Sequence, residues 1–189
     1  MITITQSGFA EQTINKSRFL AWAAQCEDER AVGAMLRAIA SKHATASHLA
    51  YAFRVKTPDG VVPRFSDAGE PSGTAGKPIL QMLDGRHLIN VCVGVIRYYG
   101  GVNLGTGGLV KAYGGTAKMA LEAAVLAPFV EMQRIEINID YKRVDELMRV
   151  VEKAQGTVLD KQFGEQVKVQ IVLPTHAVEA VANRFTQPY

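Results

Sequence analysis

The sequence predicts a mixed α/β (α+β) protein of two domains, and three observations support this. Residues 87–99, HLINVCVGVIRYY, are almost continuously apolar, which is typical of a central strand covered on both faces. The stretch before Pro128 alternates strand and helix patterns and ends in a long helix. After Pro128 the pattern restarts in the order β-α-β-β-α, a ferredoxin-like unit without its last strand. We therefore expect domains at 1–128 and 129–189, with that last strand absent or beyond Tyr189.

Hydrophobic periodicity places the first elements of the N-terminal domain. Alternation at 2–6 and the apolar pattern at about 15–25 predict two strands, with SGFA between them as a turn. Asp28 and Glu29 suit the start of a helix because the N-terminal end of the helix dipole is positive. That helix is expected to end near His43.

The middle of the domain is predicted from its turn and helix signals. LAYAFRVK, the turn TPDG and VVPRF predict a hairpin over 49–65, in which Pro63 confines the second strand to an edge. Pro78 suits the first turn of a short helix, and Gly85 suits its end. A long helix is expected over 109–126.

The second domain follows with four elements. They are a strand at 134–140, a helix at 141–156, a hairpin over 157–174 and a helix at 175–185. Its basic residues are offset by acidic ones, and no chemical motif stands out in it.

The composition is that of an ordinary soluble globular protein, 48% hydrophobic and 21% charged. A net charge of +3 permits a phosphate or nucleic-acid partner without requiring one. No basic start with an apolar core marks a signal peptide, and no apolar run approaches the ~20 residues of a membrane helix. We therefore expect a cytoplasmic protein with no membrane partner. Cys26 and Cys92 lack a CxxC spacing, which predicts buried free thiols and no zinc site.

Two glycine-rich loops, FSDAGEPSGTAGKPIL at 65–80 and GGVNLGTGG at 100–108, each follow a strand and lead into a helix. Helix N-termini present unpaired N–H groups and a partial positive charge, so they suit anions. Neither loop is a nucleotide loop, because Pro71 and Pro78 break the G-x-x-x-x-G-K-[ST] pattern and no dinucleotide-type GxGxxG follows a strand. Tight turns and close packing explain the glycines equally well.

If the loops converge, they form a basic, hydroxyl-lined groove edged by aromatic side chains. Such a groove suits a phosphodiester backbone with an exposed base. The candidate nucleic-acid- or anion-binding residues are Ser72, Thr74, Lys77, Arg97, Tyr98, Tyr99, Asn103, Thr106 and Lys111.

Catalysis has weaker support in the sequence. Asp67 and Glu70 could act as a general base or bind a metal, but acids in such loops more often cap turns. His43 and His48 have the spacing H-x-x-x-x-H, which holds a metal only on a continuous helix, and a strand begins at Leu49. No nucleophile elbow or Ser-His-Asp set is present. We expect no catalytic residue, no metal and no cofactor.

The two loop motifs, FSDAGEPSGTAGKPIL and VIRYYGGVNLGTGGLVKAYGG, resemble the paired signature of the IMPACT family, the bacterial YigZ-like proteins. KSRFLA and HATASHLAYAF extend the resemblance over most of 16–124. It implies an N-terminal domain of the superfold shared by ribosomal proteins, elongation factor G domain IV and GHMP-type kinases. It also implies a ferredoxin-like second domain similar to elongation factor G domain V. Ala68 departs from the S-D-D-G of bacterial members, which weighs against a two-carboxylate metal site.

The resemblance also implies a function. Eukaryotic relatives regulate translation with an additional N-terminal domain that this chain lacks, so that specific role is not expected here. For bacterial relatives it implies nucleic-acid or ribosome association. We expect a non-enzymatic protein that binds RNA or the ribosome at its two loops, with a regulatory role in translation and a protein of the translation machinery as a further partner. The alternatives are an enzyme acting on a small phosphorylated substrate at the same loops, and a protein-interaction module.

Overall fold

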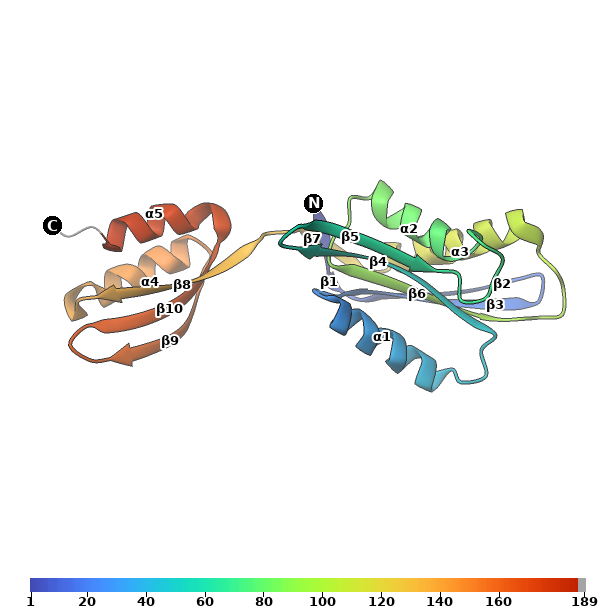
Figure 1. Ribbon diagram of the computed structural model, residues 1–189, viewed down its shortest axis with the longest axis horizontal. Helices are drawn as coiled ribbons and strands as arrows, with labels where there is room; N and C mark the ends of the chain where they lie inside the picture. Colours follow the sequence, from blue (N-terminus) through green and yellow to red (C-terminus); the bar gives the residue numbers. More distant parts are fainter. Residues whose placement is uncertain (187–189) are drawn as a thin grey trace. The chain divides into compact units, whose positions relative to one another are not determined.

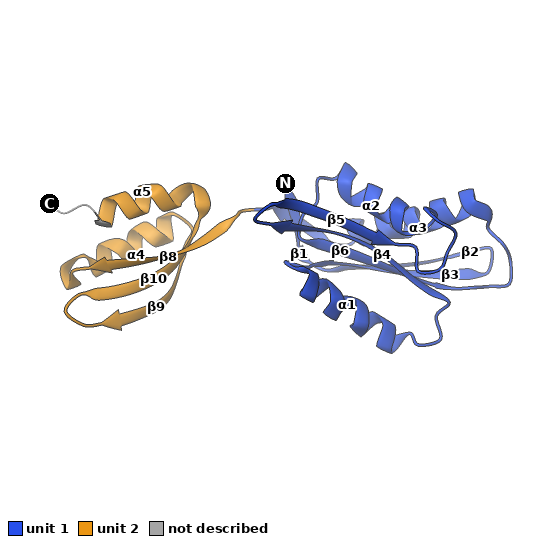
Figure 2. Cartoon of the chain, in the orientation of Figure 1, with its two compact units in different colours: residues 1–129 blue, residues 130–189 orange. Residues whose placement is uncertain are grey.

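The computed structural model describes residues 1–186 and confirms a two-domain α+β fold (Figure 1). The chain divides into two compact units, Met1–Phe129 and Val130–Tyr189 (Figure 2). None of the described helices is long and apolar enough to cross a lipid bilayer.

Unit 1 is built on a five-stranded antiparallel sheet in the order β2-β3-β6-β4-β5. Its strands are β2 (Gly8–Ile14), β3 (Ser17–Gln25), β4 (His48–Thr57), β5 (Gly60–Ser66) and β6 (Val91–Tyr98). The central strand β6 comes from the apolar run, and it is buried from Val91 to Arg97 because both faces of the sheet are covered. A smaller sheet pairs β1 (Ile2–Gln6) with β7 (Val125–Pro128).

Helices cover both faces of this sheet. α1 (Glu29–Lys42) lies on one face, and α2 (Gly76–Gly85) and α3 (Gly105–Glu122) lie on the other (Figure 1). The main core fills the α2 and α3 side and includes Phe19, Ile79, Leu83, Tyr113 and Leu121. Smaller clusters fill the α1 side and contain the buried free thiols of Cys26 and Cys92.

Unit 2 carries a three-stranded antiparallel sheet in the order β8-β10-β9. Its elements are β8 (Met132–Ile139), the 3-10 turn η1 (Tyr141–Arg143), α4 (Val144–Lys153), β9 (Thr157–Phe163), β10 (Val167–Pro174) and α5 (Thr175–Thr186). This is the order of a ferredoxin-like unit, with no fourth strand among the residues described. The core includes Ile137, Leu147, Val169, Ile171 and Val181.

Two local expectations are wrong. SGFA is not a turn, since β2 already begins at Gly8, and the hairpin turn lies at Asn15 and Lys16 with φ of 45° and 64°. Gly8 instead permits close packing, because a Cβ there would lie 2.0 Å from the Ala120 carbonyl oxygen. The long helix also stops at Glu122, and the next residues form the edge strand β7, which pairs with β1.

Candidate functional site

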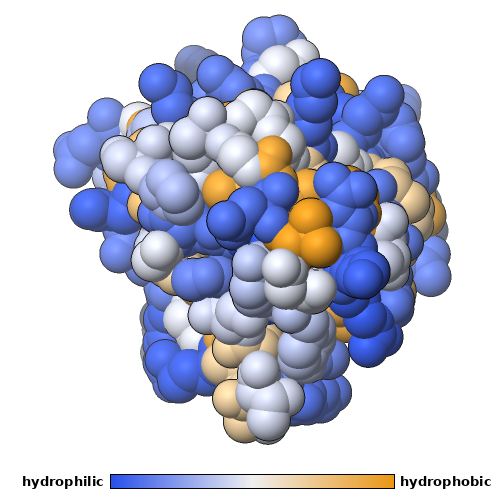
Figure 3. All heavy atoms as spheres, turned by 90° about the vertical axis from the view of Figure 1, so that its right-hand side faces the viewer, coloured by the Kyte–Doolittle hydropathy of each residue, from blue (hydrophilic) through white to orange (hydrophobic). Residues whose placement is uncertain are grey.

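The two glycine-rich loops meet at one end of the unit 1 sheet. The first follows β5 and the second follows β6, and both run into helices on the same face. α2 and α3 pack closely, since a Cβ on Gly114 would lie 3.5 Å from the Pro78 Cβ. Figure 3 looks onto this end of the molecule and shows a mainly hydrophilic surface with small hydrophobic patches.

A buried ion pair lies beneath the loops. Arg97 Nη1 donates to both carboxylate oxygens of Glu70, at 2.9 and 3.2 Å, and Tyr113 donates its hydroxyl hydrogen to Oε1 at 2.7 Å. Arg97 Nη2 donates to Ser17 Oγ at 3.3 Å. Glu70 is 8% exposed and Arg97 is 6% exposed. We predicted from the sequence that Arg97 binds a phosphate. In the structure its guanidinium is bound instead to the protein's own carboxylate, that of Glu70.

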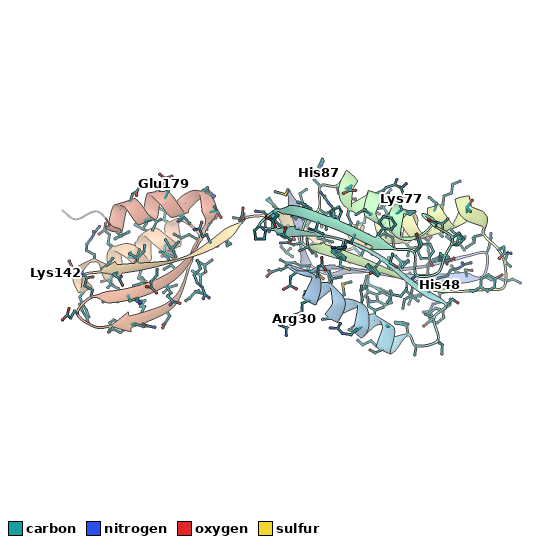
Figure 4. All side chains as sticks on the ribbon, viewed as in Figure 1. Arg30, His48, Lys77, His87, Lys142 and Glu179 are labelled. Atoms are coloured by element: carbon teal, nitrogen blue, oxygen red, sulfur yellow. The ribbon has the colours of Figure 1, made fainter. Side chains whose placement is uncertain are left out.

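The network extends to the start of β4. His48 Nδ1 donates to the Ala68 carbonyl oxygen at 2.8 Å, and its Nε2 lies 3.9 Å from Glu70 Oε1. Figure 4 shows His48 at the start of β4 and Lys77 on α2. His43 takes a different partner, the Tyr98 hydroxyl at 2.8 Å, so the two histidines do not form a pair. No group of three or more His, Cys, Asp or Glu side chains suited to a metal occurs among the described residues.

The N-terminus of α2 already holds an anion, the carboxylate of Asp67. Its Oδ2 accepts from the Gly73 N–H at 2.8 Å, and its Oδ1 accepts from Ala75 and Gly76 at 3.0 and 2.8 Å. Burial alone would raise the pKa of Asp67, but these backbone hydrogen bonds outweigh burial and hold the pKa below its usual value. Asp67 therefore occupies the backbone donors of this loop that the sequence left open to an external anion. Thr74 is also buried and donates its hydroxyl hydrogen to the Pro71 carbonyl.

The N-terminus of α3 differs. Leu104 precedes the helix without a side-chain capping hydrogen bond, and the first turn contains no acidic residue. Thr106 and Lys111 are exposed there. Tyr99 is 49% exposed and donates its hydroxyl hydrogen to Asn103 Oδ1 at 3.2 Å. The N–H groups of this helix end therefore have no carboxylate partner among the described residues.

The structure sorts the predicted residues into three groups. Ser72 and Lys77 are exposed at the start of α2, and Tyr99, Asn103, Thr106 and Lys111 surround the start of α3. Thr74 and Arg97 are buried. Tyr98 points to the α1 face, where it packs with Ile39 and Leu20, because successive strand residues face opposite ways.

Three residues of the network were not among the predicted binding residues, and His48 was considered only as a metal ligand. Ser17 accepts from Arg97 and from the Gly100 N–H at 3.2 Å, His48 supports Ala68, and Tyr113 binds Glu70. Tyr113 offered a signal, since a tyrosine on the inward face of a helix requires a buried partner for its hydroxyl.

Comparison with known proteins gives consistent matches along the chain. The model of the Impact N-terminal domain matches residues 15–121, and that of a domain of unknown function, DUF1949, matches residues 137–187. An IMPACT family member from Haemophilus influenzae is 34% identical over 94% of this chain and 86% of its own length. The IMPACT family member YigZ from Escherichia coli is 33% identical over 88% of this chain and 82% of its own. A crystal structure of a hypothetical protein aligns with a TM-score of 0.73 and 30% identity, covering 97% of this chain and 89% of that one. The chain therefore belongs to the IMPACT family, as its two loop motifs indicated.

Proposed function

We propose that this chain is a non-enzymatic protein that binds RNA, free or in the ribosome, at the loop end of unit 1. The observation that carries the proposal is the contrast between the two helix N-termini. Asp67 fills the α2 end, whereas the α3 end has neither a capping side chain nor an acid in its first turn. An uncapped, exposed helix N-terminus favours a phosphate through its N–H groups and its dipole.

Side chains around this end suit a nucleic-acid backbone. Thr106 supplies a hydroxyl, and Lys111 supplies a positive charge about one and a half turns further along the helix. The Arg97 Cζ lies 5.1 Å from the centroid of the Tyr99 ring, and the half-exposed Tyr99 side chain suits stacking on a base. Phosphate contacts would therefore provide most of the affinity, and binding should weaken steeply with salt.

The alternative of an enzyme acting on a phosphorylated substrate has less support. Asp67 uses both carboxylate oxygens on backbone N–H groups, and Glu70 is buried against Arg97 and Tyr113. Neither acid is therefore free to take a proton from a substrate.

Membership of the IMPACT family, rather than the site itself, supports a role in translation. The resemblance of the two domains to elongation factor G domains IV and V supports a ribosomal binding site. We propose that the chain acts there as a regulator in the cytoplasm, with a translation-machinery protein as a further partner.

The proposal can be tested by fluorescence anisotropy with a labelled single-stranded oligouridine RNA over a range of salt concentrations. Thr106→Asp supplies α3 with its own carboxylate and should abolish binding, while Lys111→Ala should weaken it and lower the salt slope by about 1. Lys118→Ala, two turns further along the same helix, is the matched control and should bind as the wild type does. Wild-type affinity in Thr106→Asp would reject the α3 site. A thermal shift with a phosphorylated metabolite that Asp67→Asn removes, without RNA binding, would favour the enzyme.

A further inference from the structure

The two faces of the unit 1 sheet are covered unequally. α2 and α3 lie on one face, whereas α1 alone among the described elements lies on the other (Figure 1). α1 packs over the central strand, where Ile39 contacts Ile96 and a Cβ on Gly94 would lie 3.2 Å from Leu36. The edge strand β2 lies two strand spacings from β6, or about 10 Å, which is about the diameter of a helix. The band over β2 and the outer part of β3 therefore lies open beside α1, and a second helix packed against α1 would have its axis over β2.

Two aromatic side chains lie at one end of this open band, and the polar residues Glu11, Thr13 and Arg18 face the rest of it. Phe9 of β2 is 48% exposed, and its ring centroid lies 5.1 Å from that of Trp22 on β3. The Trp22 ring lies 5.1 Å from His43 at the end of α1. Strand alternation sends Ala10 into the core beneath α3 and leaves Phe9 on the α1 face without a covering element. Exposed aromatic rings of this kind are typical of the centre of protein interfaces.

A cavity of about 230 Å³ opens between Trp22 and α1. Met35, Ala38 and Ile39 give it an apolar wall. The cavity is smaller than a typical small-molecule pocket and suits a single large side chain better than a ligand. It therefore fits an anchor residue such as Phe or Leu from a partner.

The charge of Lys42 indicates which kind of side chain the partner places next to its anchor residue. Lys42 lies at the rim of the cavity, and none of the ion pairs found within residues 1–186 includes it. Arg18, a cation of the neighbouring strand β3, is already paired with Glu11. A single unpaired cation beside an apolar cavity favours an acidic side chain next to the anchor, and it is too little charge for a nucleic-acid backbone.

The geometry points to a docking site for an amphipathic helix of a partner protein, lying beside α1 over β2 and β3. One aromatic or leucine anchor fills the cavity between Trp22 and α1, neighbouring apolar residues cover Phe9, and an acidic residue pairs with Lys42. Apolar residues at i, i+3, i+4 and i+7 are the pattern with which helices fill such grooves. This surface lies on the opposite face of the sheet from the proposed RNA site and does not depend on it.

Trp22 makes the site directly observable because it is the single tryptophan of the chain. The probe is a capped amphipathic peptide of about 15 to 20 residues, long enough to form a helix, with Phe and Leu on one face and Glu beside them. A second peptide carries Lys in place of each Glu. We expect the Glu peptide to change the Trp22 emission saturably and to bind at least about tenfold more tightly than the Lys peptide.

Variants of the whole chain locate the contact. Phe9→Ala and Lys42→Glu should each weaken binding of the Glu peptide by about tenfold or more, and Lys42→Glu should improve binding of the Lys peptide. Arg37→Glu is the matched control, because this exposed cation of α1 points away from the cavity. Thermal melts check that each variant is folded. The proposal is overturned if the Glu peptide causes no saturable change, if Phe9→Ala binds as the wild type does, or if oligouridine RNA produces the change instead.

Discussion

Glu70 and Arg97 form an almost completely buried ion pair that fastens the first glycine-rich loop to the end of the central strand. The two residues are 27 positions apart in sequence, and Tyr113 of α3 completes the network through its 2.7 Å hydrogen bond to Glu70. Loop, sheet and helix are thus fixed at one buried point. The network therefore stabilises the conformation of the loop surface that lies above it.

Removing Glu70 should destabilise unit 1 strongly. Glu70→Ala leaves the buried Arg97 guanidinium without its charge partner, so we expect a loss of about 3–5 kcal/mol in the free energy of unfolding, measured by urea denaturation. Glu122→Ala breaks exposed contacts with Arg86 and Lys118 and should cost at most about 1 kcal/mol. An equal loss of unfolding free energy in the two variants would show that the buried ion pair stabilises the protein no more than an exposed one.

Tyr113 should remain protonated in the folded protein at pH values where tyrosine ordinarily ionises. Burial raises its pKa first, and the hydrogen bond and charge of Glu70 raise it further. Its stabilising contribution is therefore complete below about pH 10 and is lost as the pH rises above that value. Absorbance titration of the native protein should show one tyrosine fewer ionising near pH 10 than in urea, and Tyr113→Phe should remove that difference.

Tyr113→Phe should also lower the free energy of unfolding by about 1–2 kcal/mol, since it removes a hydrogen bond in the core. Full ionisation of all tyrosines near pH 10 in the folded state would contradict this assignment.

Asp67 should stabilise the first loop only while it is charged. Asp67→Asn weakens the hydrogen bonds from Gly73, Ala75 and Gly76, and we expect it to cost about 1–2 kcal/mol near neutral pH. Because the folded pKa lies below the unfolded one, this advantage is present above about pH 4 and disappears as the pH falls further. Urea denaturation across that range should show the two proteins converging in acid. Asp59→Asn, in the exposed turn of the β4–β5 hairpin, is the control and should differ little from the wild type at either pH.

Local patterns were sufficient for the fold class and for the position of the loops, but not for the strands β2 and β7. The continuous apolar run predicted the buried strand β6, and the order of elements after Pro128 predicted the ferredoxin-like unit. These features depend on periodicity and on order along the chain, which a single sequence contains. The loop motifs themselves were specific enough to indicate the family.

The sequence could not show that the protein's own carboxylates bind Arg97 and the N-terminus of α2. An arginine at the end of an apolar strand can face solvent or a buried acid, and only the fold brings Arg97 to Glu70. Likewise, nothing local shows that Asp67 folds back onto the start of α2. Tyr98 is different, because alternation with Arg97 already predicts that the two side chains face opposite ways. That prediction was available and would have removed Tyr98 from the site.

The β2–β3 turn was missed because its sequence, Asn15-Lys16, is not the best one for its backbone. Both residues have positive φ, 45° and 64°, as in the two-residue turns that favour Asn-Gly. Lys16 is exposed and adopts a left-handed conformation that disfavours a side chain, so Lys16→Gly should raise the free energy of unfolding by about 0.5–1 kcal/mol. Lys161→Gly, at an exposed position inside β9, should instead lower it by about 0.5–1 kcal/mol. Urea denaturation of both variants distinguishes relief of backbone strain in the turn from the general effect of introducing a glycine. A loss of stability in Lys16→Gly would mean that the Lys16 side chain makes a contribution larger than the strain it imposes.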